Sequence, residues 1–160
     1  FCAGLAGASL HLVGHSLGGL VALRALERAP SLGVRRVVLV GTPIADCHAA
    51  HRLARLPGGR ALLGKSMRQW LSEARRTVSP RCEIGVIAGD RRIGLGRFVA
   101  PDLARPNDGV VSLEETTVPG MRDRVVLHVS HTPMLFSRSV ADAVCAFVER
   151  GRFGPTGGGA

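Results

Sequence analysis

The chain has 160 residues, 46% of them hydrophobic, and a formal net charge of +9. A chain of this length is one domain or part of one, and it is large enough to bury about two thirds of the unfolded surface. The positive charge comes almost wholly from arginine, since Lys65 is the only lysine. The arginines are scattered, and five Phe, one Trp and no Tyr leave little aromatic material for stacking on bases, which argues against nucleic-acid binding.

The sequence also argues against a membrane span and a metal cofactor. No apolar run approaches the roughly 18 residues of a spanning helix, so we expect a soluble chain, while its compartment, cytoplasmic or secreted, stays open. None of the cysteines forms a C-x-x-C pair, so zinc is not expected, although one disulfide stays open. We expect no other cofactor. The cysteines are Cys2, Cys47, Cys82 and Cys145.

The first predicted elements are a short apolar strand and, directly after it, an amphipathic helix. The segment 10–13 is short and apolar enough for an interior parallel strand. From residue 17 to 29 apolar side chains recur at helical spacing, as expected of a helix that packs against a sheet, and Pro30 ends it. We expect His11 and His15 to be packing residues or neighbours of the turn between the two elements.

That turn has the sequence Gly14-His15-Ser16-Leu17-Gly18, which matches G-x-S-x-G. In such a turn the positions two before and two after the serine come close together, so a Cβ at either is expected to clash. The serine is expected in a strained conformation with its hydroxyl exposed, and the Leu17 amide then faces any oxyanion formed beside it. The pattern alone is weak in a chain with 21 glycines, so the flanking strand and helix carry the prediction of a nucleophilic serine.

The middle of the chain predicts a second strand and two helices. Residues 34–40, centred on the apolar run at 37–40, are predicted to form a buried strand, which completes the strand-helix-strand pattern of a parallel sheet. Residues 44–56 are expected to hold a short helix on which His48 and His51 share a face, and without further ligands a solvated helix is favoured over a metal site. Residues 60–76 repeat apolar side chains at helical spacing, which favours a packed helix over the wall of an acyl-binding cleft.

The last part of the chain predicts two strands, at residues 82–88 and 125–129, and a long connection between them. That connection, from residue 91 to 107, has few periodic features, and loops of this length are usually functional or mobile. A final amphipathic helix is predicted over residues 137–150, and Gly151 ends it.

Four stretches of the sequence carry a resemblance to a known family. They are Gly-His-Ser-Leu-Gly-Gly at 14–19, Gly-Thr-Pro at 41–43, Asn-Asp-Gly-Val-Val at 107–111 and Ser-His-Thr-Pro-Met-Leu at 130–135. Through them the chain resembles the α/β-hydrolases, especially the small bacterial lipases and esterases, over nearly its whole length. The resemblance implies an α/β fold with a mostly parallel sheet flanked by helices. Many relatives have Gly where Pro133 stands, a difference expected to stiffen that loop without removing a catalytic atom.

The resemblance also implies which residues act on the substrate. In the family the acid and the base lie in the last two of these stretches, which puts them at Asp108 and His131. His131 then takes the proton of Ser16, and a buried Asp108 carboxylate fixes the tautomer of the ring. Asp90, directly after the third strand, is the alternative acid, and His128, expected inside the last strand, is the alternative base. His131 is favoured because active groups lie just beyond the carboxyl ends of strands.

The activity implied is that of a serine hydrolase that cleaves carboxylic esters through an acyl-enzyme. Its substrate is then a small-molecule or lipid ester, and it needs no cofactor. One alternative is acyl transfer or thioester hydrolysis by the same three residues. The other is a non-catalytic module that binds membrane surfaces through its arginines.

The family's sheet usually has eight strands, and four are predicted here, matching the last four. We therefore expect residues 1–153 to be the C-terminal part of one α/β-hydrolase domain, and residues 154–160 to be a flexible Gly-rich tail. The remaining strands and the second oxyanion donor are then expected in a part that this sequence does not contain. Activity is accordingly expected of the complete protein.

Overall fold

The computed structural model describes residues 9–44, 47–55, 82–94 and 100–154. Four strands within them form one sheet in the order β1-β2-β3-β4, and all neighbouring strands are parallel. The strands are β1 (Leu10–His15), β2 (Val34–Val40), β3 (Glu83–Gly89) and β4 (Asp123–Leu127). The helices are α1 (Leu17–Arg28), α2 (His48–Arg55) and α6 (Arg138–Arg150), with short 3-10 helices η2 (Pro30–Leu32) and η3 (Pro133–Phe136). The predicted α/β architecture is confirmed.

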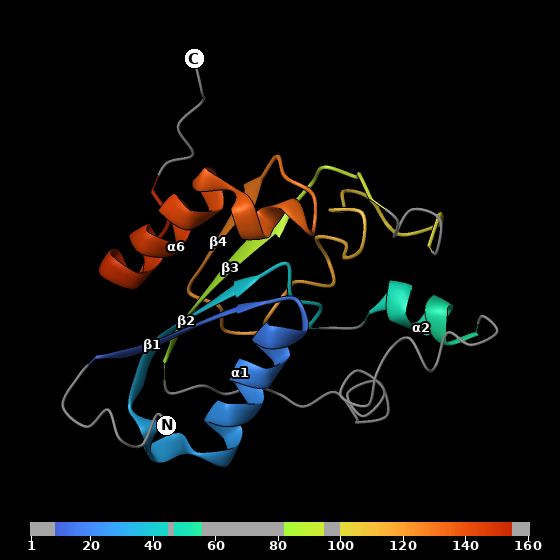
Figure 1. Ribbon diagram of the computed structural model, residues 1–160. Coiled ribbons are helices and arrows are strands. Elements are labelled where there is room, and N and C mark those ends of the chain that lie inside the picture. The colour runs from blue at the N-terminus through green and yellow to red at the C-terminus, as the bar shows by residue number, and fades with distance from the viewer. Residues whose placement is uncertain (1–8, 45–46, 56–81, 95–99, 155–160) are drawn as a thin grey trace.

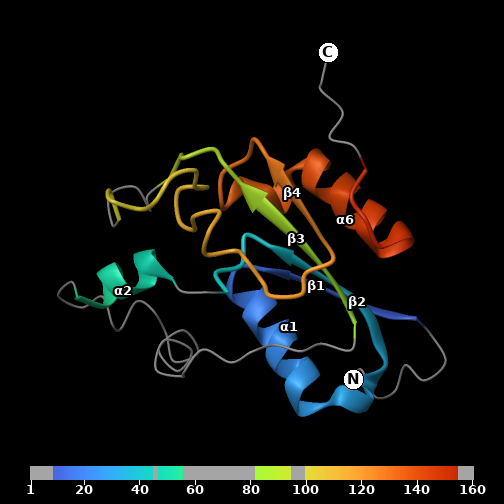
Figure 2. The same cartoon turned by 180° about the vertical axis from the view of Figure 1, so that it is seen from behind.

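Two helices cover the two faces of the sheet. Figures 1 and 2 show α1 and α6 on opposite sides of the strands, with α2 set to the side. Phe147 of α6 is fully buried, and a Cβ added to Gly85 of β3 would lie 2.7 Å from its ring. On the other face Leu23 of α1 packs with Val37 and Leu39 of β2. The alternation of side chains along β2 therefore supplies both cores.

Within the described residues the predicted strands and helices are confirmed, with differences at their ends. β2 has the predicted bounds, while β1 continues two residues further than expected, to His15. The prediction of the last strand at 125–129 was wrong by two residues, because Asp123 already pairs with Gly85 of β3. The strand ends early because the chain turns after Leu127, whose carbonyl accepts the amide of Val129. Sequence patterns locate a strand better than they locate its ends.

Several predictions fall wholly or partly on residues that the structure does not describe. The helix at 60–76, Cys2 and the tail beyond residue 154 lie outside the described residues. Of the cysteines in the described ranges, Cys82 and Cys145 are free thiols. No helix in the described ranges is long and apolar enough to cross a membrane.

A buried arginine ties β2 to the end of α6. The Arg36 guanidinium donates from Nε to Oε2 of Glu83 (2.6 Å) and from Nη1 to the carbonyl of Val148 (2.7 Å). Arg122 pairs with the other Glu83 oxygen (2.9 Å) and donates to the Gly151 carbonyl (2.9 Å). The hydrogen bond from Arg36 lowers the pKa of the Glu83 carboxyl below its ordinary value. These two cations therefore bind carbonyls that a helix C-terminus leaves without partners.

Candidate active site

The site is built on the sharp turn between β1 and α1. Ser16 lies between the last residue of the strand and the first of the helix, with φ 53° and ψ −123°. It is the one non-glycine residue with positive φ among those described, so the predicted strain is confirmed. Its amide donates to the carbonyl of Val40 at the end of β2 (2.9 Å), which holds the turn against the neighbouring strand. Leu17 follows as the first residue of α1, where amides have no acceptor within the helix.

The glycines around Ser16 act differently from the prediction. A Cβ on Gly14 would lie 2.5 Å from the backbone of Gly19, so position 14 does require glycine. Gly18 has open space where a Cβ would go, and the expectation of a clash there was wrong. The second obligatory glycine is Gly19, where a Cβ would lie 2.1 Å from Oγ1 of Thr42. The close approach is between α1 and the segment after β2, which a five-residue pattern does not contain.

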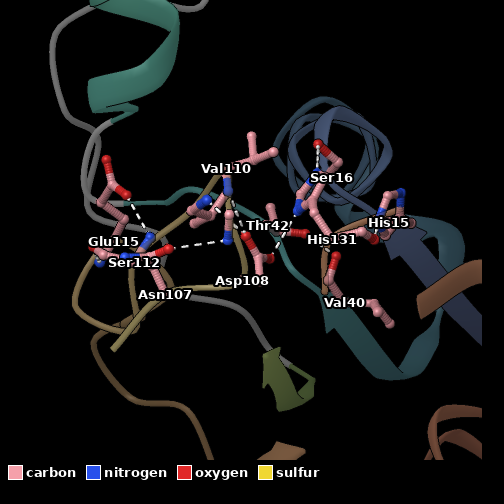
Figure 3. Close-up of polar contacts among 12 residues, drawn as sticks. His15, Ser16, Val40, Thr42, Asn107, Asp108, Val110, Ser112, Glu115 and His131 are labelled. Atoms are coloured by element: carbon pink, nitrogen blue, oxygen red, sulfur yellow. Dashed lines mark hydrogen bonds and ion pairs between the residues drawn. The ribbon is translucent and has the colours of Figure 1, made fainter. Parts of the chain in front are cut away.

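The structure brings Ser16, His131 and Asp108 into one hydrogen-bonded series (Figure 3). Nε2 of His131 lies 3.0 Å from Oγ of Ser16, and its Nδ1 lies 2.7 Å from Oδ2 of Asp108. Asp108 is 1% exposed and His131 8%, while Ser16 is partly exposed. Because a carboxylate only accepts hydrogen bonds, Nδ1 carries the proton, which leaves Nε2 free to accept from the serine hydroxyl.

Backbone amides fix the orientation of the Asp108 carboxylate. Its Oδ1 accepts the amides of Val110 (2.9 Å) and Val111 (2.8 Å), so Oδ2 is left for the imidazole. The backbone carbonyl of Asp108 accepts the amide of His131 (2.9 Å). Asn107 closes the same turn, since its Oδ1 accepts the amide of Gly109 (3.0 Å). The loop therefore presents one carboxylate oxygen to His131 in a fixed direction.

The alternative acid and base pair with each other. Nδ1 of His128 lies 2.9 Å from Oδ1 of Asp90, and the His128 side chain is 78% exposed. The expectation that His128 lies inside the last strand was wrong, because β4 ends at Leu127. In the part of the chain that the structure describes, neither Asp90 nor His128 hydrogen-bonds to the Ser16–His131 pair. The structure therefore keeps this pair apart from the Ser16 site.

His15 contacts His131 from the turn between β1 and α1. Its Nε2 lies 3.0 Å from the carbonyl oxygen of His131, and the two ring centroids are 4.7 Å apart. Burial, followed by the charge of His131, lowers the pKa of His15. A neutral His15 with its proton on Nε2 donates to that carbonyl. His11, the other histidine of β1, has its pKa lowered by burial and then by the charge of Arg36.

Gly41 is a residue of the site that the sequence indicated only as the end of a strand. It follows β2 with φ 53°. A Cβ there would lie 3.2 Å from Nδ1 of His131, 3.3 Å from Oδ2 of Asp108 and 3.0 Å from Sδ of Met134. Those first two atoms form the hydrogen bond that orients the imidazole. The position therefore needs glycine both for its backbone and for the room it leaves.

Replacing Gly41 with alanine is expected to slow the reaction of the Ser16 hydroxyl with a fluorophosphonate about 10- to 100-fold in the intact protein. The new methyl group presses on the His131–Asp108 pair, and a small misplacement of reacting groups costs on the order of a hundredfold. G33A is the matched control, because Gly33 also has positive φ (64°) but open space around it. Both variants are expected to lose about 1 kcal/mol of stability from backbone strain. Equal rates of fluorophosphonate labelling for G41A and G33A would contradict this reading.

The two histidines of α2 do not gather a metal site in the described residues. Nε2 of His48 lies 3.3 Å from Oδ1 of Asp102, which also lies 3.3 Å from Nη2 of Arg52. No group of three or more His, Cys, Asp or Glu side chains within the described ranges is arranged to hold a metal ion.

Comparisons with known proteins address the family. A family model of the alpha/beta hydrolase fold matches residues 1–78, which include the turn at Ser16. The chain has the α/β-hydrolase fold. Among solved structures it is similar to the mature lipase BlEst2 of Bacillus licheniformis, with a TM-score of 0.66 and 18% identity over 89% of the chain. A search of the curated proteins finds no significant match.

Two further solved structures share the fold of this chain. The metagenomic carboxyl esterase MGS0156 has a TM-score of 0.54 and 23% identity over 77% of the chain. The thioesterase domain SrfTE, which cyclises the lipopeptide antibiotic surfactin, has a TM-score of 0.51 and 15% identity over 91% of the chain. The chain spans 65% of the length of BlEst2, 45% of the esterase and 67% of the thioesterase domain. At these identities the likeness establishes the fold.

Proposed function

We propose that this protein cleaves carboxylic esters through an acyl-enzyme formed on Ser16. The observation that carries the proposal is the series of short contacts from the Ser16 hydroxyl through His131 to Asp108. A serine hydroxyl is activated when it is hydrogen-bonded to a base and a buried acid orients that base. Because the chain spans only part of its structural neighbours, the activity is proposed for the whole protein.

The proposed reaction has two half-reactions. Ser16 Oγ attacks the carbonyl carbon of the ester while its proton passes to Nε2 of His131, and the imidazolium then returns that proton to the departing alcohol oxygen. Water, activated by the same nitrogen, attacks the acyl-enzyme and releases the carboxylic acid. The Asp108 carboxylate stabilises the imidazolium in both halves without taking its proton.

The Leu17 amide is proposed to donate to the oxyanion of each tetrahedral intermediate. It opens α1 directly after the nucleophile, where the positive end of the helix dipole favours negative charge. Loss of one such donor typically costs about 3 kcal/mol of barrier, so a second donor matters to the rate.

A second candidate uses the same acyl-enzyme with a different acceptor or leaving group. The fold is shared with a thioesterase domain as well as with a lipase and a carboxyl esterase, which supports thioester cleavage or acyl transfer as the alternative. Paired assays of an ester and the matching thioester, each with water alone and with added alcohol, separate the two. Ester hydrolysis predicts the free acid as the main product in both conditions.

A fluorophosphonate probe tests the proposal directly. In the intact protein it is expected to label Ser16, because only a serine activated by a base attacks phosphorus quickly. S16A is expected to be unlabelled, whereas S31A, which removes the exposed hydroxyl of η2, is expected to label like the wild type. Peptide mass spectrometry locates the adduct. A folded wild-type protein that stays unlabelled, or one labelled at another residue, would refute the proposal.

A further inference from the structure

Glu115 is a buried carboxylate that the proposed reaction does not use. It is 8% exposed and lies seven positions beyond Asp108 in the sequence. Its Oε2 accepts the amide of Ser112 (2.7 Å), and Oγ of Ser112 accepts the amide of Glu115 (3.2 Å). This reciprocal pair has the spacing and the contacts of a capping box, here closing a turn. The Glu115 side chain therefore fixes the residue at which the acid-bearing loop ends.

The same carboxylate also reaches a different part of the chain. Its Oε1 accepts the amide of His48 (2.6 Å), the first residue of α2, where a negative charge is favourable. The backbone carbonyl of Glu115 accepts the amide of Ile44, before α2 (2.7 Å). Glu115 thus joins the segment after β2 to the loop that holds Asp108, and Figure 3 shows its contact with Ser112 of that loop.

The loop held by Glu115 is the one that orients the acid. Asn107 and Ser112 form an antiparallel bridge at its two ends, and Asp108 lies between them. Ser112 is the next residue after Val111, whose amide binds the Asp108 carboxylate. Displacing Ser112 therefore moves one of the two amides that leave Oδ2 facing His131.

α2 packs on the same part of the chain through other contacts. Ala49 of α2 belongs to a small apolar cluster with Ala100, Leu103 and Val110. Asp102 pairs with the side chains of α2 described above. The helix and the acid-bearing segment accordingly lie against each other, and Glu115 supplies the buried polar link between them.

We propose that Glu115 is a positioning residue that sets the Asp108 carboxylate against His131 by fastening the 107–112 loop to the N-terminus of α2. The inference rests on the proposed function of the Ser16 site. Both carboxylate oxygens accept backbone amides, and glutamine has only one oxygen to offer. In E115Q the side-chain NH₂ faces one of the two backbone amides, of His48 or of Ser112. That hydrogen bond is lost, and a buried backbone amide has no acceptor.

The test compares E115Q with E114Q in the intact protein. Glu114 is the exposed neighbour, so its substitution removes the same charge one position away. E115Q is expected to lower kcat for a small ester about 10- to 100-fold and to slow fluorophosphonate labelling of Ser16 similarly, while KM changes less than threefold. The downfield proton signal of the His131 Nδ1–H, hydrogen-bonded to Asp108, is expected to weaken at a temperature where circular dichroism shows both variants folded. E114Q is expected to match the wild type in all four measurements.

A second variant acts on the other end of the link. Proline is tolerated at the first position of a helix but has no amide proton, so H48P removes the donor to Oε1 of Glu115 and keeps Glu115 itself. H48P is expected to lower kcat and the labelling rate more than H48A, which loses the same side chain but keeps the backbone donor. The comparison of H48P with H48A tests the role of Glu115 if E115Q does not fold.

The outcomes separate the two proposals. A folded wild-type protein without labelling at Ser16 refutes the proposed function. Normal labelling of the wild type, with E115Q equal to E114Q or H48P equal to H48A, overturns the role of Glu115 and leaves the proposed function standing. A loss of activity explained wholly by unfolding, with an unchanged His131 signal in the folded fraction, also overturns it.

Discussion

Replacing Asp108 with asparagine is expected to lower kcat for ester hydrolysis about 10⁴-fold while the protein stays folded. The amides of Val110 and Val111 require an acceptor, so the Asn oxygen takes the place of Oδ1. The side-chain NH₂ then faces His131 and donates to Nδ1, which forces the ring proton onto Nε2. In that tautomer the imidazole has no lone pair for the Ser16 proton. Steady-state kinetics of the intact D108N protein measure the effect.

D90N is the control for this prediction. Asp90 is partly exposed and pairs with the exposed His128, and exposed ion pairs contribute little. We expect D90N to keep kcat within about twofold of the wild type, as for a surface change away from the reacting groups. If D90N loses more activity than D108N, the acid of the reaction is Asp90.

Replacing Arg36 with methionine is expected to reduce the free energy of unfolding by about 3 kcal/mol. Methionine keeps much of the apolar stem but removes the cation, which leaves the Glu83 carboxylate and the Val148 carbonyl without this donor. Removing one partner of a buried ion pair typically costs about 3 to 5 kcal/mol of stability. Because Glu83 is partly exposed, we expect a loss near the lower value of that range. Urea titration of the folded protein, followed by circular dichroism, measures the change.

R35M provides the comparison at the neighbouring position. Arg35 is exposed on the same strand, and R35M is expected to change stability by less than about 0.5 kcal/mol. Equal stabilities of R36M and R35M would contradict a structural role for the buried cation.

Acid titration gives a second view of the same contact. The pKa of Glu83 is lowered in the folded state. Its contribution to the free energy of unfolding is therefore fully present above the ordinary carboxyl pKa, and it is lost as the pH falls through the lowered pKa. The wild type should therefore lose more stability than R36M over that acid range.

Much of the architecture could be predicted from local patterns. The strand predicted at 34–40 from its apolar run at 37–40, and the amphipathic segment at 137–150, place β2 and α6 within one residue of their observed ends. Because both faces of the sheet are covered there, residues 37–40 of β2 are continuously apolar, so the signal is strong. The residues expected around Ser16 do lie in hydrogen-bond contact, while their catalytic roles remain proposals.

The missed features depend on approaches between distant segments. Gly18 and Gly19 are adjacent glycines that the sequence does not distinguish. Only the position of Thr42, after β2, makes Gly19 indispensable. Gly41 and Glu115 are likewise defined by partners from elsewhere in the chain. A single sequence without a fold does not contain these distances.

Every polar atom of His131, in the backbone and in the ring, has a hydrogen-bond partner. The backbone amide binds Asp108, the carbonyl accepts from His15, and the two ring nitrogens meet Asp108 and Ser16. A ring so tethered does not turn to follow a departing alcohol. In the proposed reaction the alcohol oxygen has to arrive at Nε2 from one direction, so the site has an inherent handedness, and mirror-image alcohols present their oxygens to it unequally.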